Sequence, residues 1–545
     1  MASHTTATQD CLRVSEISLV IIGFLRPTDL ARLVRTCRAM YEGGRPTLWK
    51  AQRSLRPLLR LLPPDAWSED LDERGSSIFR ITDPEKIEWT RFDSFAQHVR
   101  TFCWDDVNEV SPDTLSVLSG RGRPLFPRLR WLSLTDRTGK IGLPSIHLFL
   151  VPTIDHLVLS LISFNAEVAI MCQTFQRVGA TCTNLAFLEL WQEEIKDVDG
   201  NSDDIPTPPQ QLTDDINDAL AVLLGGLPKL ENFRASAISI SASCVEALAA
   251  LPSVVQVDTH LIPPDMHTVA AAAARSSREG RPWFNALGEL ALGVNEMDRS
   301  TATFLRAIRS KALECLVIEC FIQPDSYTVK HNLEVVARRP SLRTLMMGLG
   351  HVPEDSSRVY ETLDVEDALQ PLYALPSLHT VDIRCASLVV SANAVRDIAN
   401  AWRELSTLEL LSLMLPHGGV EKPSLTLEDL IPLAVNCPEL RALGLPLNAE
   451  EVPDGATLER LLPAPSRSPL FAFTACYAPI ENPGQVAHFL ARLFPKLRAA
   501  VYRDTAAKSL PYETKKGTFW GKWKIVHNLL APPPPPPPGP DQAFE

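Results

Sequence analysis

The sequence predicts an α/β protein in which a small N-terminal bundle of three helices precedes a curved solenoid, with parallel strands inside and helices outside. Three observations predict this fold class. Apolar residues recur at helical spacing in the first fifty positions, an apolar-x-x-apolar-x-apolar motif then returns many times, and helix-period segments lie between the motifs. A chain of 545 residues is also too long for one ordinary core, which favours a repeat array.

The N-terminal segment has the apolar spacing of short helices. One apolar stripe is formed by Ile17, Val20, Ile21, Phe24 and Leu25. Pro27 and Thr28 stop this helix and cap a second one, which the Gly43-Gly44 pair and Pro46 end. A third short segment closes a bundle of about forty residues, whose core is marginal unless a partner or a neighbouring domain covers it. Exposed apolar surface on this bundle is therefore a candidate docking face.

Residues 10–52 resemble an F-box, through the motifs Glu16-Ile17, Asp29-Leu30, Thr36-Cys37-Arg38 and Leu48-Trp49. The Leu-Pro pair that commonly opens this domain is replaced by Leu12-Arg13-Val14, in which Val14 still supplies an apolar contact. The resemblance implies docking on a Skp-type adaptor and, through it, on a cullin scaffold. The implied adaptor-binding residues are Leu12, Val14, Ile17, Ile21, Leu25, Leu30, Leu33, Cys37 and Trp49. An alternative is that residues 12–52 only form a helical cap on the rest of the chain.

Internal repetition covers most of the remaining length. Clear copies of the motif begin at Leu129, Leu185, Leu342, Leu378 and Leu440. Weaker copies begin at Val99, Ile154, Leu230, Val254, Leu287, Leu313, Leu408, Leu470 and Leu497. The fourteen copies have a mean period of about 31 residues, near the periods of leucine-rich repeats. Since each copy ends in strand-like alternation and a helical run precedes the next, the strands should form one parallel sheet.

The array resembles the irregular leucine-rich repeats that follow many F-boxes, and the whole chain resembles the fungal-type F-box and leucine-rich-repeat family. The asparagine that usually follows the last leucine of each repeat is mostly missing, with Asn295 and Asn448 as exceptions, so uneven turns are expected. The alternative is a large α/β domain with a single ordinary parallel sheet.

Five segments follow from these patterns. We expect a disordered N-terminus at 1–9, the F-box at 10–52, junction helices at 53–94, the solenoid with its C-terminal cap at 95–530, and a disordered proline-rich tail at 531–545. The capping helix is predicted by the spacing of Phe519, Trp520, Trp523, Val526 and Leu530. The tail should be an extended polyproline helix, which an SH3, WW or profilin-like domain could bind.

Composition limits the classes of function. A net charge of −12 argues against nucleic-acid binding, because phosphate neutralisation needs a basic face. The basic and aromatic residues between Lys515 and Lys524 fit core packing better than nucleic-acid stacking. The longest charge-free apolar stretch near the N-terminus is too short for a membrane span, so we expect a cytoplasmic or nuclear protein. The eleven cysteines form no Cys-x-x-Cys pair and are expected to be reduced and mostly buried.

Catalytic and metal-binding motifs are not recognisable. The chain has no Gly-x-Ser-x-Gly, His-Glu-x-x-His or phosphate-binding glycine loop, and its twelve histidines do not cluster at ligand spacing. The acidic stretch at 197–204 resembles a calcium loop, but its glycine is misplaced and Pro208 replaces the bidentate glutamate, so it is interpreted as a solvated insertion loop. We therefore expect no cofactor, no metal and no enzymatic activity.

The sequence predicts a substrate-recognition subunit of a Skp-cullin-F-box ubiquitin ligase. The F-box would dock the adaptor, and the strand face of the array or its adjoining loops, including 193–204, would bind an unknown target protein. Catalysis would then belong to the partner enzymes. The alternative is a non-catalytic repeat scaffold or protein-interaction protein outside any ligase.

Overall fold

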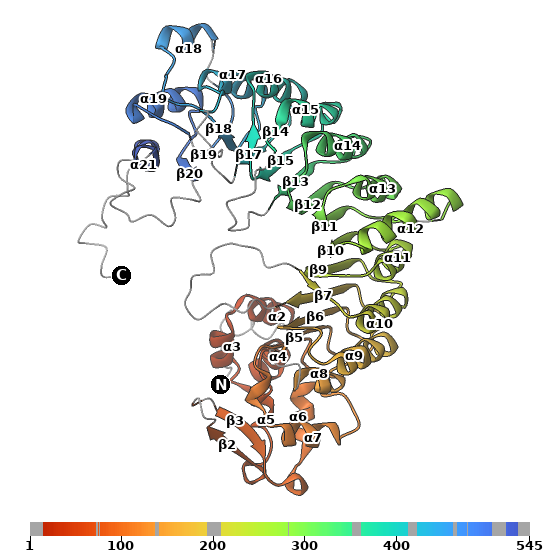
Figure 1. Ribbon diagram of the computed structural model, residues 1–545. Coiled ribbons are helices and arrows are strands. Elements are labelled where there is room, and N and C mark those ends of the chain that lie inside the picture. The colour runs from red at the N-terminus through yellow and green to blue at the C-terminus, as the bar shows by residue number, and fades with distance from the viewer. Residues whose placement is uncertain are drawn as a thin grey trace, which may run out of the picture. The chain divides into compact units, whose positions relative to one another are not determined.

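The computed structural model describes residues 15–71, 75, 77–136, 141–192, 209–281, 283–350, 361–412, 422–461, 466–476, 478–503 and 519–531. The described residues up to His260 form one compact unit, and those from Leu261 form a second. In each unit, helices cover one side of a parallel sheet (Figure 1).

The N-terminal bundle contains three helices, but Gly43, Gly44 and Pro46, which were expected to end the second helix, lie inside the third. The helices are α2 (Ser15–Phe24), α3 (Pro27–Leu33) and α4 (Arg38–Leu48). Pro27 begins α3 at a position where its missing N–H is not needed, and Asp29 places a negative charge in the first turn. Ile22, Leu30 and Val34 form the buried core between the helices.

The junction after the bundle differs from the predicted set of helices. It holds β1 (Ala51–Gln52), α5 (Arg56–Leu59), β2 (Trp67–Leu71), β3 (Ser77–Ile81) and α6 (Trp89–Ala96). Strands β2 and β3 form an antiparallel hairpin, in which the rings of Trp67 and Phe79 stack with centroids 4.9 Å apart. The leucine-rich start of the junction forms only the four-residue helix α5, which ends at Leu59, before the Pro63-Pro64 pair. Strand β1 pairs with the first repeat strand, so the sheet begins before the first predicted repeat.

Glu109 ties the junction to the first repeat. Its carboxylate accepts hydrogen bonds from the Ser54 hydroxyl and, at 2.7 Å, from the Leu55 backbone N–H, and it lies 3.6 Å from Nε of Arg56. Burial raises the pKa of the Glu109 carboxyl, and this effect exceeds the opposing effects of the hydrogen bonds and of Arg56. The junction is therefore joined to the first repeat by a buried polar contact as well as by the pairing of β1 with β4.

The first unit carries a parallel sheet in the order β1-β4-β5-β6-β7-β9-β10, with β8 added beside β9. Its repeat strands are β4 (Thr101–Trp104), β5 (Trp131–Asp136), β6 (His156–Leu161), β7 (Phe187–Gln192), β8 (Gln210–Gln211), β9 (Asn232–Ser239) and β10 (Gln256–Leu261). Its repeat helices are α7 (Pro112–Ser119), α8 (Gly142–Ser145), α9 (Val168–Thr181), α10 (Asp214–Gly225) and α11 (Ala242–Ala250).

The second unit has the same construction, with the order β11-β12-β13-β15-β17-β18-β19-β20. These strands are β11 (Glu289–Glu296), β12 (Cys315–Ile322), β13 (Thr344–Leu349), β15 (Thr380–Cys385), β17 (Thr407–Ser412), β18 (Ala442–Pro446), β19 (Ala472–Cys476) and β20 (Ala499–Arg503). A small parallel pair is formed by β14 (Leu363–Asp364) and β16 (Leu388–Val389). The helices are α12 (Asp265–Glu279), α13 (Arg299–Ala307), α14 (Ser326–Val336), α15 (Val365–Leu369), α16 (Ala392–Ala401), α17 (Ile431–Asn436), α18 (Gly455–Leu461), α19 (Pro483–Leu493) and α21 (Phe519–Leu530).

This architecture is a leucine-rich-repeat-like solenoid, which confirms the predicted fold class. Each of the fourteen predicted motif copies holds one parallel strand, and neighbouring strands follow chain order within each unit. Alternate strand residues are buried, as Leu157, Leu159 and Leu161 are in β6. The copy predicted to begin at Leu408 begins three residues earlier in the structure. Leu405 is the buried residue that precedes β17, and Leu408 lies inside the strand.

Helix α21 closes the C-terminal end of the array, as the sequence predicted. Trp523 is fully buried, and its Nε1–H donates to the Ala478 carbonyl oxygen at 2.9 Å. The Trp523 ring also lies 6.0 Å from the Phe473 ring on β19. The expected disordered segments at 1–9 and 532–545, with the proline tail, lie outside the described residues.

Replacing Trp523 should destabilise the cap. Trp523→Ala removes a buried ring and leaves the Ala478 carbonyl without its donor, so we expect a loss of about 3–5 kcal/mol in the free energy of unfolding of this end. Ile525→Ala, on the half-exposed side of the same helix, should cost far less. Denaturant unfolding of the full-length variants measures both; equal losses would contradict this role of Trp523.

The Glu109 carboxyl should give the first unit a pH dependence of stability. Its folded-state pKa is raised above 4.5, so its favourable contribution is fully present below pH 4.5 and declines as pH rises through the raised value. Glu109→Gln keeps an acceptor for the Leu55 N–H but cannot titrate, and should remove this decline in urea unfolding across the acidic range. Glu109→Ala leaves that buried N–H without a partner and should cost about 1–3 kcal/mol at every pH. An unchanged pH profile in Glu109→Gln would refute the assignment.

Candidate functional site

Helix α2 presents large apolar side chains to solvent. Leu19 is 54% exposed, Val20 59%, Ile21 39% and Phe24 87%, whereas Ile22 is 1% exposed and faces the bundle core. Large apolar side chains exposed together on one short helix are a feature of interaction surfaces. We call Leu19, Val20, Ile21 and Phe24 the α2 patch.

The bundle that carries this patch depends on a close approach of α3 and α4. A Cβ atom built on Gly44 would overlap Cγ1 of Val34 and lie 3.2 Å from Cδ1 of Leu30. At the adjacent Gly43, a Cβ would meet only Cδ1 of Ile22 at an ordinary 3.5 Å. Glycine at position 44 is thus required by packing, whereas glycine at position 43 is not.

Three of the predicted adaptor-binding residues lie where the structure gives no side-chain position. Leu12 and Val14 lie outside the described residues, and Ile17 lies in α2 with a side chain that is not described. Ile21 belongs to the α2 patch, and Cys37 is exposed at the N-cap of α4. Cys37 therefore departs from the expectation of mostly buried thiols.

The other predicted residues lie in or beside the bundle core. Leu30 is 2% exposed, and Leu25 and Leu33 pack partly buried against it. The ring of Trp49 is half-buried and lies 4.9 Å from the ring of Phe95 on α6. Leu30 thus holds the bundle together and Trp49 packs against α6, and their involvement in docking remains a prediction.

Sequence reasoning left Leu19, Val20 and Phe24 out of the candidate set. A signal was present for two of them, because Val20 and Phe24 belong to the apolar stripe of the first predicted helix. Apolar residues surround this helix on several sides, so periodicity could not tell which of them face the core.

A second candidate surface lies on the strand face of the first unit. The rings of Trp131, His156 and Phe187, on successive strands β5, β6 and β7, form a stacked column with centroid distances of 4.9 and 5.5 Å. The guanidinium of Arg234 on β9 lies 5.5 Å over the Phe187 ring and donates to Gln256 Oε1 at 3.1 Å. We call these rings with Arg234 the aromatic column.

Charged groups flank this column. Glu189 on β7 is partly buried, which raises its carboxyl pKa, while the charge of Arg234 opposes the shift. Asp258 on β10 accepts a hydrogen bond from the Ser236 hydroxyl at 2.6 Å. Aromatic rings and arginine are enriched in the energetic centres of protein interfaces, so the column is a plausible contact surface for a protein.

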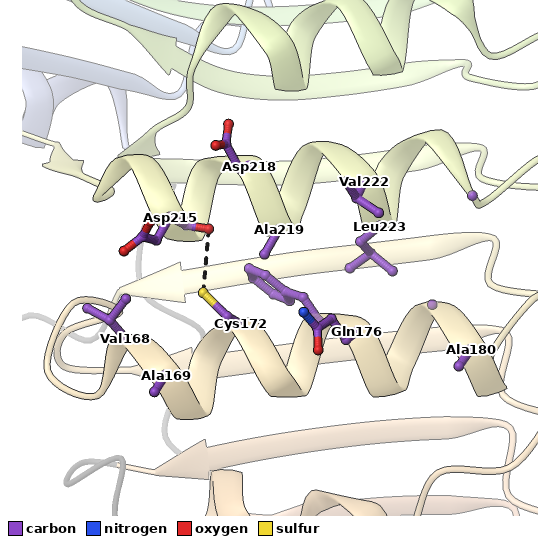
Figure 2. Close-up of a pocket in the computed structure, with 13 residues that line it drawn as sticks. Val168, Ala169, Cys172, Gln176, Ala180, Asp215, Asp218, Ala219, Val222 and Leu223 are labelled. Atoms are coloured by element: carbon purple, nitrogen blue, oxygen red, sulfur yellow. Dashed lines mark hydrogen bonds between the residues drawn. The ribbon is translucent and has the colours of Figure 1, made fainter.

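A groove of about 870 Å³ runs between α9 and α10 (Figure 2). Small and apolar side chains line most of it, and the Cys172 thiol donates to the Asp215 backbone oxygen at 3.4 Å. Burial, followed by the nearby Asp215 charge, raises the pKa of Cys172, so the thiol is held in its unreactive protonated form. The groove shows no arrangement of nucleophile, base and oxyanion donor.

The described residues form neither a metal-binding cluster nor a membrane span. In the part of the chain that the structure describes, no three His, Cys, Asp or Glu side chains gather in a way that could hold a metal ion. No described helix is both long and apolar enough to cross a bilayer. The acidic segment 193–204 lies outside the described residues.

Comparisons with known proteins support no family assignment. No protein-family model and no curated protein matches the chain. It is similar in structure to a chain from the yeast complex of Rad7 and Elc1, with a TM-score of 0.36 and 14% identity over 72% of this chain and 84% of that one. It is also similar to the APL1 leucine-rich repeat domain, with a TM-score of 0.30 and 12% identity over 76% and 82%. A Bacteroides fragilis protein matches with a TM-score of 0.22 and 9% identity over 66% and 68%.

The two glycines of α4 provide a matched test of the bundle. Gly44→Ala forces α3 and α4 apart, and should lower the stability of the bundle by about 1–3 kcal/mol. Gly43→Ala adds a methyl group that has room in the same helix, and alanine favours the helix over glycine. It should therefore raise the stability of the bundle by about 0.5–1 kcal/mol. Native-state amide hydrogen exchange of α3 and α4 measures both, and equal effects at the two positions would rule out the proposed close approach.

Proposed function

We propose that the chain is the substrate-recognition subunit of a Skp-cullin-F-box ubiquitin ligase. The N-terminal bundle acts as the F-box and docks a Skp-type adaptor through the α2 patch, and the adaptor links it to a cullin scaffold. The repeat array binds the target protein. The observation that carries the proposal is the exposure of Leu19, Val20 and Phe24 on a bundle that has only a small core of its own.

The α2 patch has the energetic character of a docking surface. Fully burying an apolar side chain of this size stabilises a complex by about 1.5–3 kcal/mol, and Phe24 is 87% exposed in the free chain. The same exposure argues against the competing interpretation, a folding cap outside any ligase, since a cap buries its apolar face against the array. The described residues leave the α2 patch uncovered.

The array supplies the second half of the function. The face of the sheet that points away from the helices takes no part in the core. In the first unit this face carries the aromatic column. A receptor of this kind performs no chemistry. It holds the target beside the partner enzymes and so raises the effective concentration of the target's lysines. The proposed SH3, WW or profilin-like partner of the proline tail stays a prediction.

The decisive variant is Val20→Asp/Phe24→Asp in the full-length chain. Both side chains are exposed, so the fold should be kept, while two charges in the interface should weaken binding of a purified Skp-type adaptor at least about 100-fold. Biolayer interferometry with immobilised adaptor measures this change.

Leu529→Asp is the matched control, because Leu529 is an apolar side chain of α21 that is 59% exposed. It should bind the adaptor like the unmodified chain. Leu30→Asp is unsuitable as a probe, since it places a charge in the bundle core. Deleting residues 1–60 is equally unsuitable, since it removes Ser54 and Leu55, the hydrogen-bond donors to Glu109. Adaptor binding unaffected by Val20→Asp/Phe24→Asp would leave the scaffold interpretation ahead.

A further inference from the structure

Basic residues occupy the position just before three neighbouring strands of the first unit. The Arg100 N–H donates to the Lys50 carbonyl oxygen at 2.8 Å, and the Arg130 N–H donates to the Arg100 carbonyl oxygen at 2.8 Å. Lys50, Arg100 and Arg130 are therefore ladder neighbours, at a strand spacing of about 4.8 Å. Directly opposed like charges in a sheet are destabilising, so this arrangement costs the fold stability.

Further basic groups gather at the same place. The Arg45 guanidinium is held 5.5 Å over the Phe95 ring, and Arg128 is exposed beside Arg100, whose Nη1 donates to the Arg128 carbonyl oxygen at 3.5 Å. Burial lowers the pKa of His98, and the charges of Arg45, Arg100 and Arg128 lower it further. We call Arg45, Lys50, Arg100, Arg128 and Arg130 the basic cluster.

The basic cluster has no internal counter-charge. No carboxylate of the described residues forms an ion pair with any of its five members, although the chain has 65 acidic against 53 basic residues. Arg100 Nη1 contacts only backbone carbonyls, of which Gln97 at 2.9 Å is the nearest. Buried atoms Nε of Arg45 and Nε2 of His98 find no hydrogen-bond partner in the described structure. The exposed charges of Lys50, Arg128 and Arg130 are thus available to an external anion, and the partly buried Arg45 and Arg100 add to the positive charge.

We propose that the basic cluster binds a phosphorylated side chain of a partner protein. Arginine forks match phosphate geometry bidentately, and clustered arginines are a general means of reading a phosphorylated segment. Trp131, which follows Arg130 and is 39% exposed, offers an apolar contact to the residues flanking the phosphate.

The extent of the cluster selects a compact anion over a polyanion. Along the same ladder the residue after Arg130 is Asp155, followed by Ala186 and Glu231. The row of basic residues therefore ends after three strands, and the following ladder positions include two acidic residues. A nucleic acid or an anionic membrane would need a longer basic face and would meet this acidic continuation and a net charge of −12.

The site can be tested on the isolated full-length chain without the adaptor. The probes are acetyl-Gly-Gly-phosphoserine-Gly-Gly-amide, its phosphotyrosine counterpart and their unphosphorylated forms, titrated by calorimetry at constant ionic strength. We expect binding only of the phosphorylated peptides, with competition by inorganic phosphate. Arg128→Gln/Arg130→Gln should weaken this binding about tenfold or more. Both side chains are exposed and form no side-chain hydrogen bond in the described structure, so the variant should keep the circular dichroism of the unmodified chain.

Arg441→Gln is the matched control. Arg441 is exposed at the same repeat position before β18, but its ladder neighbours are the uncharged Ser406 and Phe471. It should leave peptide binding unchanged. Equal binding of phosphorylated and unphosphorylated peptides, an equal loss in Arg441→Gln, or tighter binding of poly(U) RNA or phosphatidylserine vesicles would each overturn the proposal. Since the α2 patch takes no part in these measurements, such a result would not bear on adaptor binding.

Discussion

The structure depends on one packing constraint: every repeat strand buries alternate side chains against helices that lie on the same side of the sheet. Leu157, Leu159 and Leu161 do so in β6, and Leu316, Ile318 and Cys320 do so in β12. A chain that returns through a helix to the same side each time can only add the next strand in parallel. The opposite strand face and the strand ends are then free of core packing, and their residues can vary without loss of the fold.

The two ends of the array are handled differently because they meet different neighbours. At the C-terminal end Trp523 covers the last strands with a buried ring and an indole hydrogen bond. Near the start, the sheet continues into β1, and Glu109 joins the first repeat to the junction by a buried polar contact. The N-terminal bundle is thus followed directly by a strand of the array, and the described residues leave the outer side of α2 uncovered.

The α2 patch and the basic cluster, which we assign to binding, both lower the stability of the folded chain. Leu19, Val20 and Phe24 expose apolar area that a monomer alone would bury. Lys50, Arg100 and Arg130 set like charges side by side without a carboxylate partner in the described structure. Neither arrangement helps the solenoid to fold, and both are explained by ligands of matching chemistry. Trp131 of the aromatic column directly follows Arg130 of the basic cluster in the chain.

The sequence by itself determined the repeat class, thirteen of the fourteen motif positions and the presence of helices at the N-terminus, because apolar periodicity indicates which residues of a repeat face the core. It did not determine the bounds of those helices, since α4 continues through Gly43, Gly44 and Pro46. It could not determine which apolar residues of α2 remain outside, since the apolar stripe includes Ile21 but not Ile22, whereas packing against Leu30 and Val34 buries Ile22. The β2–β3 hairpin also escaped prediction, because its pairing joins residues on both sides of a turn and is stabilised by the Trp67–Phe79 contact. The basic cluster is assembled by strand register from residues as far apart as Lys50 and Arg130, and only the tertiary structure brings such residues together.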